Sequence, residues 1–154
     1  IDVGIARAAL RDAAAFVRTR ARPWYEAEVD RAVDDPLTTQ RFGELDVDLI
    51  AAEAVLDRAR RSVDRVYTEP ADEAAARASL DVAAAKVLAE RASVGLGSAL
   101  FELCGTRAVL PDVGLDRHWR NARTHTLHDP VRWKFQHLGR HVLTGQVPPQ
   151  HGAI

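Results

Sequence analysis

Apolar residues recur at steps of three and four through the first twenty positions, with arginines and aspartates between them. This spacing puts the apolar side chains on one face and predicts an amphipathic helix over residues 1–20. We expect the helix to end near Pro23, because a proline disfavours helical angles at the residue before it. Residues 23–36 are then a connection, in which Asp35 and Pro36 predict an N-cap followed by the first helical position.

The helix expected over residues 36–67 has the most regular pattern in the chain. Its apolar positions alternate steps of four and three without a break, and such a heptad seam requires equally long helices as partners. The seam consists of Leu45, Leu49, Ala52, Leu56, Ala59, Val63 and Val66.

A second long helix is expected over residues 71–104, after a break at residues 68–70. Glycine weakens a helix interior by about 1 kcal/mol relative to alanine. We therefore expect Gly95 and Gly97 to allow close approach of a neighbouring backbone, and Gly105 to end the helix. Four apolar residues of this helix recur every seven positions: Leu80, Val87, Val94 and Phe101.

The remainder of the chain predicts two shorter helices. Residues 106–114 contain proline and glycine and are expected to be irregular, and a short helix follows over residues 115–124. Asp129 and Pro130 predict a second N-cap and first-turn proline, which begin a final helix that ends near Leu143.

These elements predict an all-α fold, because no stretch alternates long enough to form a strand. The expected architecture is an antiparallel, up-down four-helix bundle with its last helix broken. We assign residues 1–145 to this domain and residues 146–154, which are rich in proline and glycine, to an extended tail.

Composition limits the function. The 154 residues are 47% hydrophobic and 28% charged, with a net charge of -1, which argues against disorder, a membrane span and a basic nucleic-acid binder. Cys104 is the only cysteine, so the chain has no internal disulfide and we expect a cytoplasmic protein. We expect Cys104 itself to be a small core residue. No signal peptide is evident. Methionine is absent, even at position 1, so we expect the chain to have been processed or cut from a longer protein.

Basic and imidazole side chains concentrate between Leu115 and His141. This stretch has six Lys or Arg against two acids, and five of the six histidines of the chain. Guanidinium groups bind phosphates and carboxylates with a planar fork of donors, but a solvated helix face would have the same composition. Trp119, Trp133 and Phe135 either cover the bundle end or line an apolar pocket.

The histidines allow three interpretations. His125 and His128 would share a helical face, so a metal is conceivable, but two ligands are too few and we predict no metal site. A proton-carrying imidazole near the mouth of the bundle is the more attractive interpretation, against a capping or packing role. His137 and His141 are expected at the surface.

Four segments together resemble the C-terminal helical domain of the acyl-CoA dehydrogenase superfamily, over almost the whole chain. They are GIARAALRDAAAFVRTRARPW, DPLTTQRFGELDVDLIAAEAVLDRA, FELCGTR and GLDRHWRNARTHTLHDPVRWKFQHLG. Within the last of them, WRNARTHTLHDP is most similar to the flavin-dependent monooxygenase branch, which includes dibenzothiophene monooxygenases and sulfur-acquisition oxidoreductases. The catalytic glutamate of the dehydrogenases has no counterpart here other than Asp129.

The resemblance implies specific site residues. It assigns His128 to the flavin-facing acid/base position, with His125 as the weaker partner. It places Arg20 at the flavin phosphate of a neighbouring subunit, and Gly105 with Thr106 near the flavin across a subunit boundary. Flavin contacts are also implied for the basic helix, at Arg120, Asn121 and Arg123. A second glycine usual in dehydrogenases is missing after Gly105, which favours FMN over FAD.

The function implied is the C-terminal domain of a monooxygenase that uses reduced FMN, with a separate flavin reductase as a possible partner. Family enzymes have two further domains that contribute to the flavin and substrate sites, so the resemblance implies that this chain alone is inactive. It implies a homodimer or homotetramer assembled through the helices. From the composition we expect no nucleic-acid partner and no membrane partner. The alternatives are an FAD-dependent acyl-CoA dehydrogenase domain and a non-catalytic oligomerisation module.

Overall fold

The computed structural model describes residues 1–149, which form five α-helices and contain no strand. Three short 3-10 turns lie in the connections, including one directly after α3 where the sequence predicted irregular chain. The helices are α1 (Asp2–Thr19), α2 (Pro36–Thr68), α3 (Asp72–Cys104), α4 (Asp116–Thr126) and α5 (Val131–Thr144).

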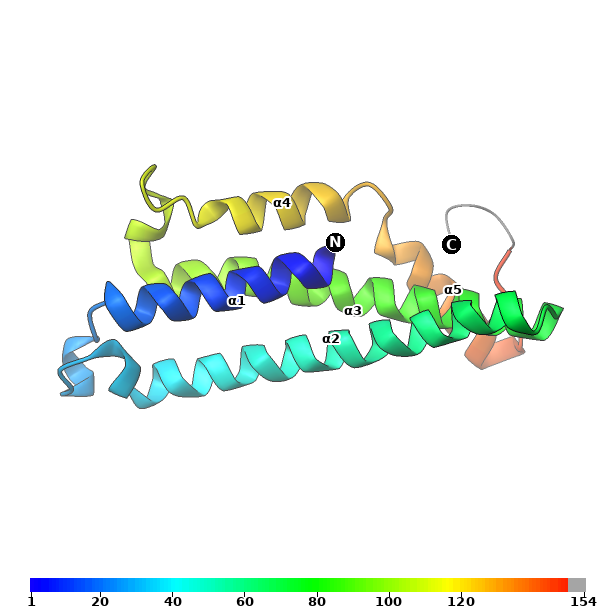
Figure 1. Ribbon diagram of the computed structural model, residues 1–154, viewed down its shortest axis with the longest axis horizontal. Helices are drawn as coiled ribbons and strands as arrows, with labels where there is room; N and C mark the ends of the chain where they lie inside the picture. Colours follow the sequence, from blue (N-terminus) through cyan, green and yellow to red (C-terminus); the bar gives the residue numbers. More distant parts are fainter. Residues whose placement is uncertain (150–154) are drawn as a thin grey trace.

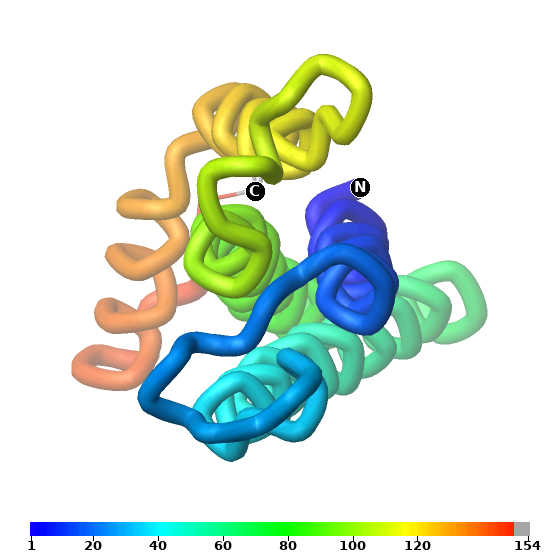
Figure 2. Tube along the Cα trace, turned by 90° about the vertical axis from the view of Figure 1, so that its left-hand side faces the viewer, coloured from blue at the N-terminus to red at the C-terminus, as the bar shows by residue number. Residues whose placement is uncertain are grey.

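The helices pack as an antiparallel bundle with α3 at its centre (Figure 1). Seen along the bundle in Figure 2, α3 is surrounded by α1, α2, α4 and α5, and it contacts all four. The successive helices α1 to α4 alternate in direction, and α5 covers the end of α3 that α4 does not reach. The predicted all-α bundle is thus confirmed, and α4 and α5 are the two parts of its broken last helix.

The predicted helix boundaries follow local chemistry. The Asp35 carboxylate accepts a hydrogen bond from the Leu37 amide at 2.9 Å and caps α2, and Pro36 occupies the first turn as expected. α3 ends at Cys104, where Gly105 adopts a φ of +66°. Cys104 is buried as predicted, and burial raises the pKa of its thiol to about 11.

The predicted seam of α2 is buried for only part of its length. Leu45, Leu49, Ala52 and Ala59 are buried, but Leu56 is 45% exposed. The expectation of an unbroken seam is wrong here, because α1 begins only at Asp2 and leaves this part of α2 uncovered (Figure 1). The result is a largely apolar hollow of about 430 Å³ between α1, α2 and α3, with His125 on its rim.

The two glycines of α3 have different surroundings. A Cβ on Gly97 would lie 3.0 Å from the Trp119 Cα, so the absence of a side chain lets the α4 backbone lie directly against α3. Gly95 is exposed and has nothing within 4 Å of its Cβ position. Close approach is therefore confirmed for Gly97 and wrong for Gly95.

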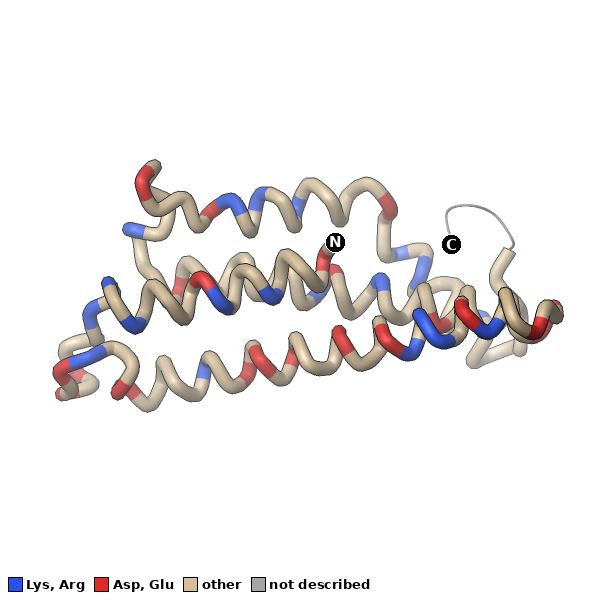
Figure 3. The backbone as a smooth tube through the Cα atoms, viewed as in Figure 1, with Lys and Arg blue, Asp and Glu red and all other residues tan. Residues whose placement is uncertain are grey.

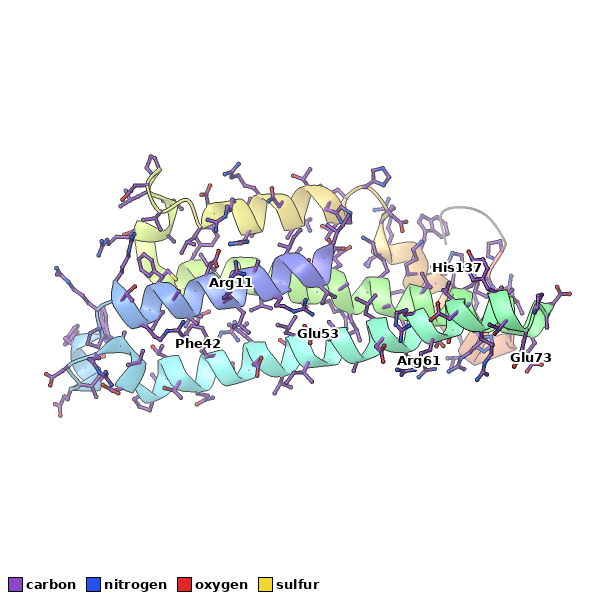
Figure 4. The ribbon with its side chains drawn as sticks, viewed as in Figure 1. Arg11, Phe42, Glu53, Arg61, Glu73 and His137 are labelled. Carbon is purple, nitrogen blue, oxygen red and sulfur yellow. The ribbon has the colours of Figure 1, made fainter. Side chains whose placement is uncertain are left out.

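Lys and Arg positions are interspersed with Asp and Glu positions along α1 and α2 (Figure 3). Glu53 on α2 faces α1, where it accepts hydrogen bonds from Arg7 Nε and Nη2 at 2.9 and 2.6 Å (Figure 4). α5 ends at Thr144, and residues 146–149 have no regular secondary structure. The part of the predicted tail at 150–154 lies outside the described residues.

Candidate functional site

α4 is fastened to α1 by one carboxylate. Asp12 Oδ2 accepts hydrogen bonds from Arg117 Nη2 at 2.6 Å and from the buried His118 Nε2 at 2.9 Å. Because a carboxylate can only accept, His118 Nε2 must be the protonated ring nitrogen. Burial acts to raise the pKa of Asp12, but the hydrogen bonds from His118 and Arg11 outweigh it and hold that pKa below its ordinary value.

Asp12→Asn is expected to lower the free energy of unfolding at pH 7 by about 1–2 kcal/mol, a range limited by solvent screening at the half-exposed Arg117. A carboxyl with a depressed pKa stabilises the fold above its unfolded pKa and loses this effect as the pH falls through the folded value. The difference between wild type and variant should therefore shrink as the pH falls below the ordinary aspartate pKa of about 3.9, and vanish below the lowered pKa of Asp12. Denaturant titrations across this range measure it.

Asp34→Asn is the matched control, since Asp34 pairs with Arg31 entirely at the surface. We expect no measurable change from this substitution. An equal loss of stability in both variants, or a loss in Asp12→Asn that persists in acid, would rule out the proposed role of the Asp12 pair.

The other end of α4 is fastened to the start of α1. His125 Nδ1 lies 2.7 Å from Asp2 Oδ1, and Lys86 Nζ on α3 lies 3.4 Å from Asp2 Oδ2. Asp2 is 5% exposed, so these two partners stabilise its charge in place of water. His125 thus has a structural bond that the sequence did not predict.

His128 lies beyond the end of α4, in the loop that leads to α5. Its side chain is exposed, and within residues 1–149 the imidazole makes no hydrogen bond. Because α4 ends at Thr126, His125 and His128 do not share the helical face that their spacing predicted. Their ring environments differ accordingly: one is tied to a buried carboxylate and the other is free to meet a ligand.

The predicted N-cap at Asp129 is wrong. Pro130 occupies the N-cap position of α5 without a side-chain hydrogen bond, and the Asp129 carboxylate instead lies 3.1 Å from Lys134 Nζ. Lys134 is 2% exposed, so the chain places an ammonium group in its interior and directs it to the loop. The Asp129 carboxylate is thus paired with Lys134 and does not cap α5.

Glu90 on α3 lies among these charged groups. Its Oε2 atom is buried and has no hydrogen-bond partner in the described part of the chain. Burial raises the pKa of Glu90, and Lys86 and Arg123 reduce that shift. The end of α4 is therefore surrounded by ionisable side chains from every adjacent segment.

Three predicted cofactor-binding residues come together at the opposite end of α1. Arg20, Gly105 and Thr106 line a hollow of about 820 Å³. Arg107 donates a hydrogen bond to the Arg20 carbonyl oxygen at 3.3 Å, which brings the end of α1 against the turn after α3. Three further arginines line the same hollow, and the sequence did not single them out: Arg22, Arg41 and Arg107.

The other predicted cofactor-binding residues lie elsewhere. Arg120, Asn121 and Arg123 line a hollow of about 310 Å³ on the outer side of α4, beside Trp119 and Leu127. The predicted site residues therefore form two groups, one at the Arg20 end of the bundle and one along α4 toward His128 (Figure 1).

Three further findings bear on the candidate chemistry and on membrane association. Across residues 1–149, no three His, Cys, Asp or Glu side chains are grouped closely enough to hold a metal ion. His137 is buried, 9% exposed, so the surface position predicted for it is wrong. Over the same residues, no helix has the length and apolar character needed to cross a membrane.

Sequence comparison identifies relatives over nearly the whole chain. Residues 1–133 match the family described as acyl-CoA dehydrogenase, C-terminal domain. The chain is 40% identical over 153 residues to a dibenzothiophene monooxygenase from Rhodococcus erythropolis, covering 96% of this chain and 36% of that protein. It is 36% identical to the probable FMNH2-dependent monooxygenase SfnC from Pseudomonas putida, covering 95% of this chain and 38% of the relative.

Solved structures agree with this assignment. FMN-bound TdsC from Paenibacillus sp. A11-2 superposes with a TM-score of 0.90 at 37% identity, covering 96% of this chain and 38% of that chain. The methanesulfinate monooxygenase MsuC from Pseudomonas fluorescens superposes with a TM-score of 0.93 at 32% identity. The match covers 97% of this chain and 40% of the MsuC chain. The chain thus spans well under half the length of these relatives. It belongs to the acyl-CoA dehydrogenase C-terminal domain family and is homologous to FMNH2-dependent monooxygenases.

Proposed function

We propose that this chain is the C-terminal domain of a monooxygenase that uses reduced FMN, and that it presents His128 to the flavin as an acid/base residue. The observation that carries the proposal is the contrast between the two neighbouring histidines. His125 is bound to Asp2, whereas His128 is exposed and unbonded in the described residues. An exposed imidazole that is free to reach a ligand suits proton transfer, because its ring nitrogens can donate or accept a proton.

The arginine-lined hollow fits the phosphate end of FMN. Arg20 and Arg22 bring guanidinium groups to its wall, and arginine binds phosphate oxygens through a planar set of donors. Gly105 has a positive φ and nothing within 4 Å of its Cβ position, so its backbone is open to a ligand. These features support FMN, as does the FMN-bound TdsC structure.

The two groups of residues imply two flavins for each chain. The 18 residues of α1 separate Arg20 from the His125 end by about 27 Å at 1.5 Å per residue. This distance exceeds the length of one FMN molecule. We therefore propose that His128 serves one flavin and the Arg20 hollow holds the phosphate of a second, each completed by another protomer.

An exposed apolar face of α2 supports assembly into a homo-oligomer. Val47 and Ile50 are 64% and 55% exposed, and exposed Gly43 and Ala54 continue the same four- and three-residue steps. This second seam is suited to a helix from another copy. We propose that a dimer or tetramer built through this seam completes each flavin site.

In this mechanism the residues of this chain orient the flavin phosphate and transfer a proton. Bound reduced FMN would supply the oxygen-activating chemistry. His128 would donate or accept one proton at a ring nitrogen, and the Arg20 hollow would orient the phosphate. The FAD-dependent dehydrogenase alternative lacks support, because it requires a free carboxylate where Asp129 is paired with Lys134.

A chimera tests the proposal. This chain would replace the aligned C-terminal segment of the 40% identical Rhodococcus erythropolis dibenzothiophene monooxygenase. With reduced FMN from a separate flavin reductase, we expect the chimera to oxygenate dibenzothiophene, while the isolated 154-residue chain neither binds FMN tightly nor turns over. A folded, FMN-binding chimera without oxygenation would contradict the proposal, as would turnover by the isolated chain.

A further inference from the structure

Lys134 is a buried cation beside the loop that carries His128. Lysine is almost never fully buried unless it is paired, because burial removes its charge from water. Lys134 is 2% exposed, and its Nζ lies 3.1 Å from Asp129 Oδ2, whereas the Asp129 side chain is 35% exposed. The pair therefore joins a fixed, interior group to a residue at the surface.

Asp129 transmits this constraint to the adjacent residue. Consecutive Cα atoms are about 3.8 Å apart, so fixing the Asp129 side chain limits the positions open to His128. On the other side, the His128 amide donates to the His125 carbonyl oxygen at 3.2 Å, and His125 is itself bound to buried Asp2. The short connection between α4 and α5 is thus held at both ends, and His128 is exposed there together with Leu127.

The geometry points to Lys134 as a positioning residue that acts through Asp129 to hold the His128 loop in one orientation. This inference rests on the proposed role of His128 in proton transfer. A catalytic imidazole must lie within hydrogen-bond reach of its proton, and loops without such anchors move on nanosecond to microsecond timescales. An exposed ion pair would constrain the loop less, since two solvated side chains lose little when they separate.

The direct test is made on the 154-residue chain without flavin. We expect Lys134→Met to raise amide exchange at Leu127 and His128 by about tenfold or more and to lower their heteronuclear NOE values, with Leu96 in α3 unchanged. Arg31→Met, which breaks an exposed pair far from the loop, is the control and should change neither. Unchanged loop exchange in folded Lys134→Met would overturn the inference.

Asp129→Ala covers the case in which Lys134→Met does not fold, because it alters only the surface partner. It should raise the exchange rates of the same loop amides, and unaltered exchange would again overturn the inference.

Turnover in the chimera separates this inference from the proposed function. If His128→Ala abolishes turnover, Lys134→Met should lower kcat by about tenfold with FMN affinity unchanged. An unchanged kcat would overturn the positioning role. If His128→Ala leaves turnover intact, the acid/base role of His128 has failed, and loop exchange alone decides whether Lys134 fixes the loop.

Discussion

Gly97→Val is expected to lower the free energy of unfolding by about 2–3 kcal/mol and the melting temperature by about 5–10 °C. A Cβ at this position would already lie 3.0 Å from the Trp119 Cα, and the branched methyl groups add further volume against backbone atoms. Backbone cannot rotate away as a flexible side chain does, so α4 must shift. Thermal and denaturant unfolding measure the loss.

Gly95→Val is the matched control, because it makes the same substitution two residues away in the same helix. Gly95 is exposed, with nothing within 4 Å of its Cβ position. The better helix propensity of valine should leave this variant as stable as the wild type or more stable by up to about 0.5 kcal/mol. Equal losses of stability in both variants would show that helix propensity, and not the packing of α4 against α3, determines the result.

The fold could be predicted because its main determinants are local. Asp35 with Pro36 starts α2, Gly105 ends α3, and the four- and three-residue steps of α2 identify its inner face. Each of these signals depends on neighbours within about two helical turns. Long helices joined by short connections then leave few arrangements other than an antiparallel bundle.

The errors arose where a distant segment decides the environment. Leu56 continues a regular seam, but it is exposed because α1 does not extend over it. Gly95 and Gly97 are equivalent in the sequence, and only the position of α4 distinguishes them. His137 is buried, which periodicity within a 14-residue helix did not reveal.

Part of the candidate site could be predicted from the sequence. The resemblance assigned Arg20 and Gly105 to one cofactor, and the structure places them in one hollow. The charged contacts around α4 were not predicted, because Asp2 and His125 are 123 positions apart. An isolated aspartate on an amphipathic helix has the same sequence signature whether it is solvated or buried beneath a histidine.

His128→Ala is expected to lower the oxygenation rate of the chimera by about 10²–10⁴-fold, the range typical of general acid/base residues. The loss of stability caused by this substitution should be small. The imidazole is exposed and unbonded within residues 1–149, and surface substitutions of this kind change stability by about 0.5 kcal/mol or less. Single-turnover oxygenation with excess reduced FMN, measured beside thermal unfolding and FMN affinity, separates lost chemistry from lost structure.

Two other histidines provide the comparison that makes this result specific. His125→Ala removes the hydrogen bond to buried Asp2, so it should destabilise the fold by about 1–3 kcal/mol. His141→Ala loses one hydrogen bond within residues 1–149, a 3.3 Å contact with the Gln146 carbonyl oxygen, and should retain turnover and stability. If His128→Ala kept full oxygenation, the chain would contribute no proton carrier at this position. The exposed face of α2 would then favour an oligomerisation module, because assembly through Val47 and Ile50 requires no imidazole.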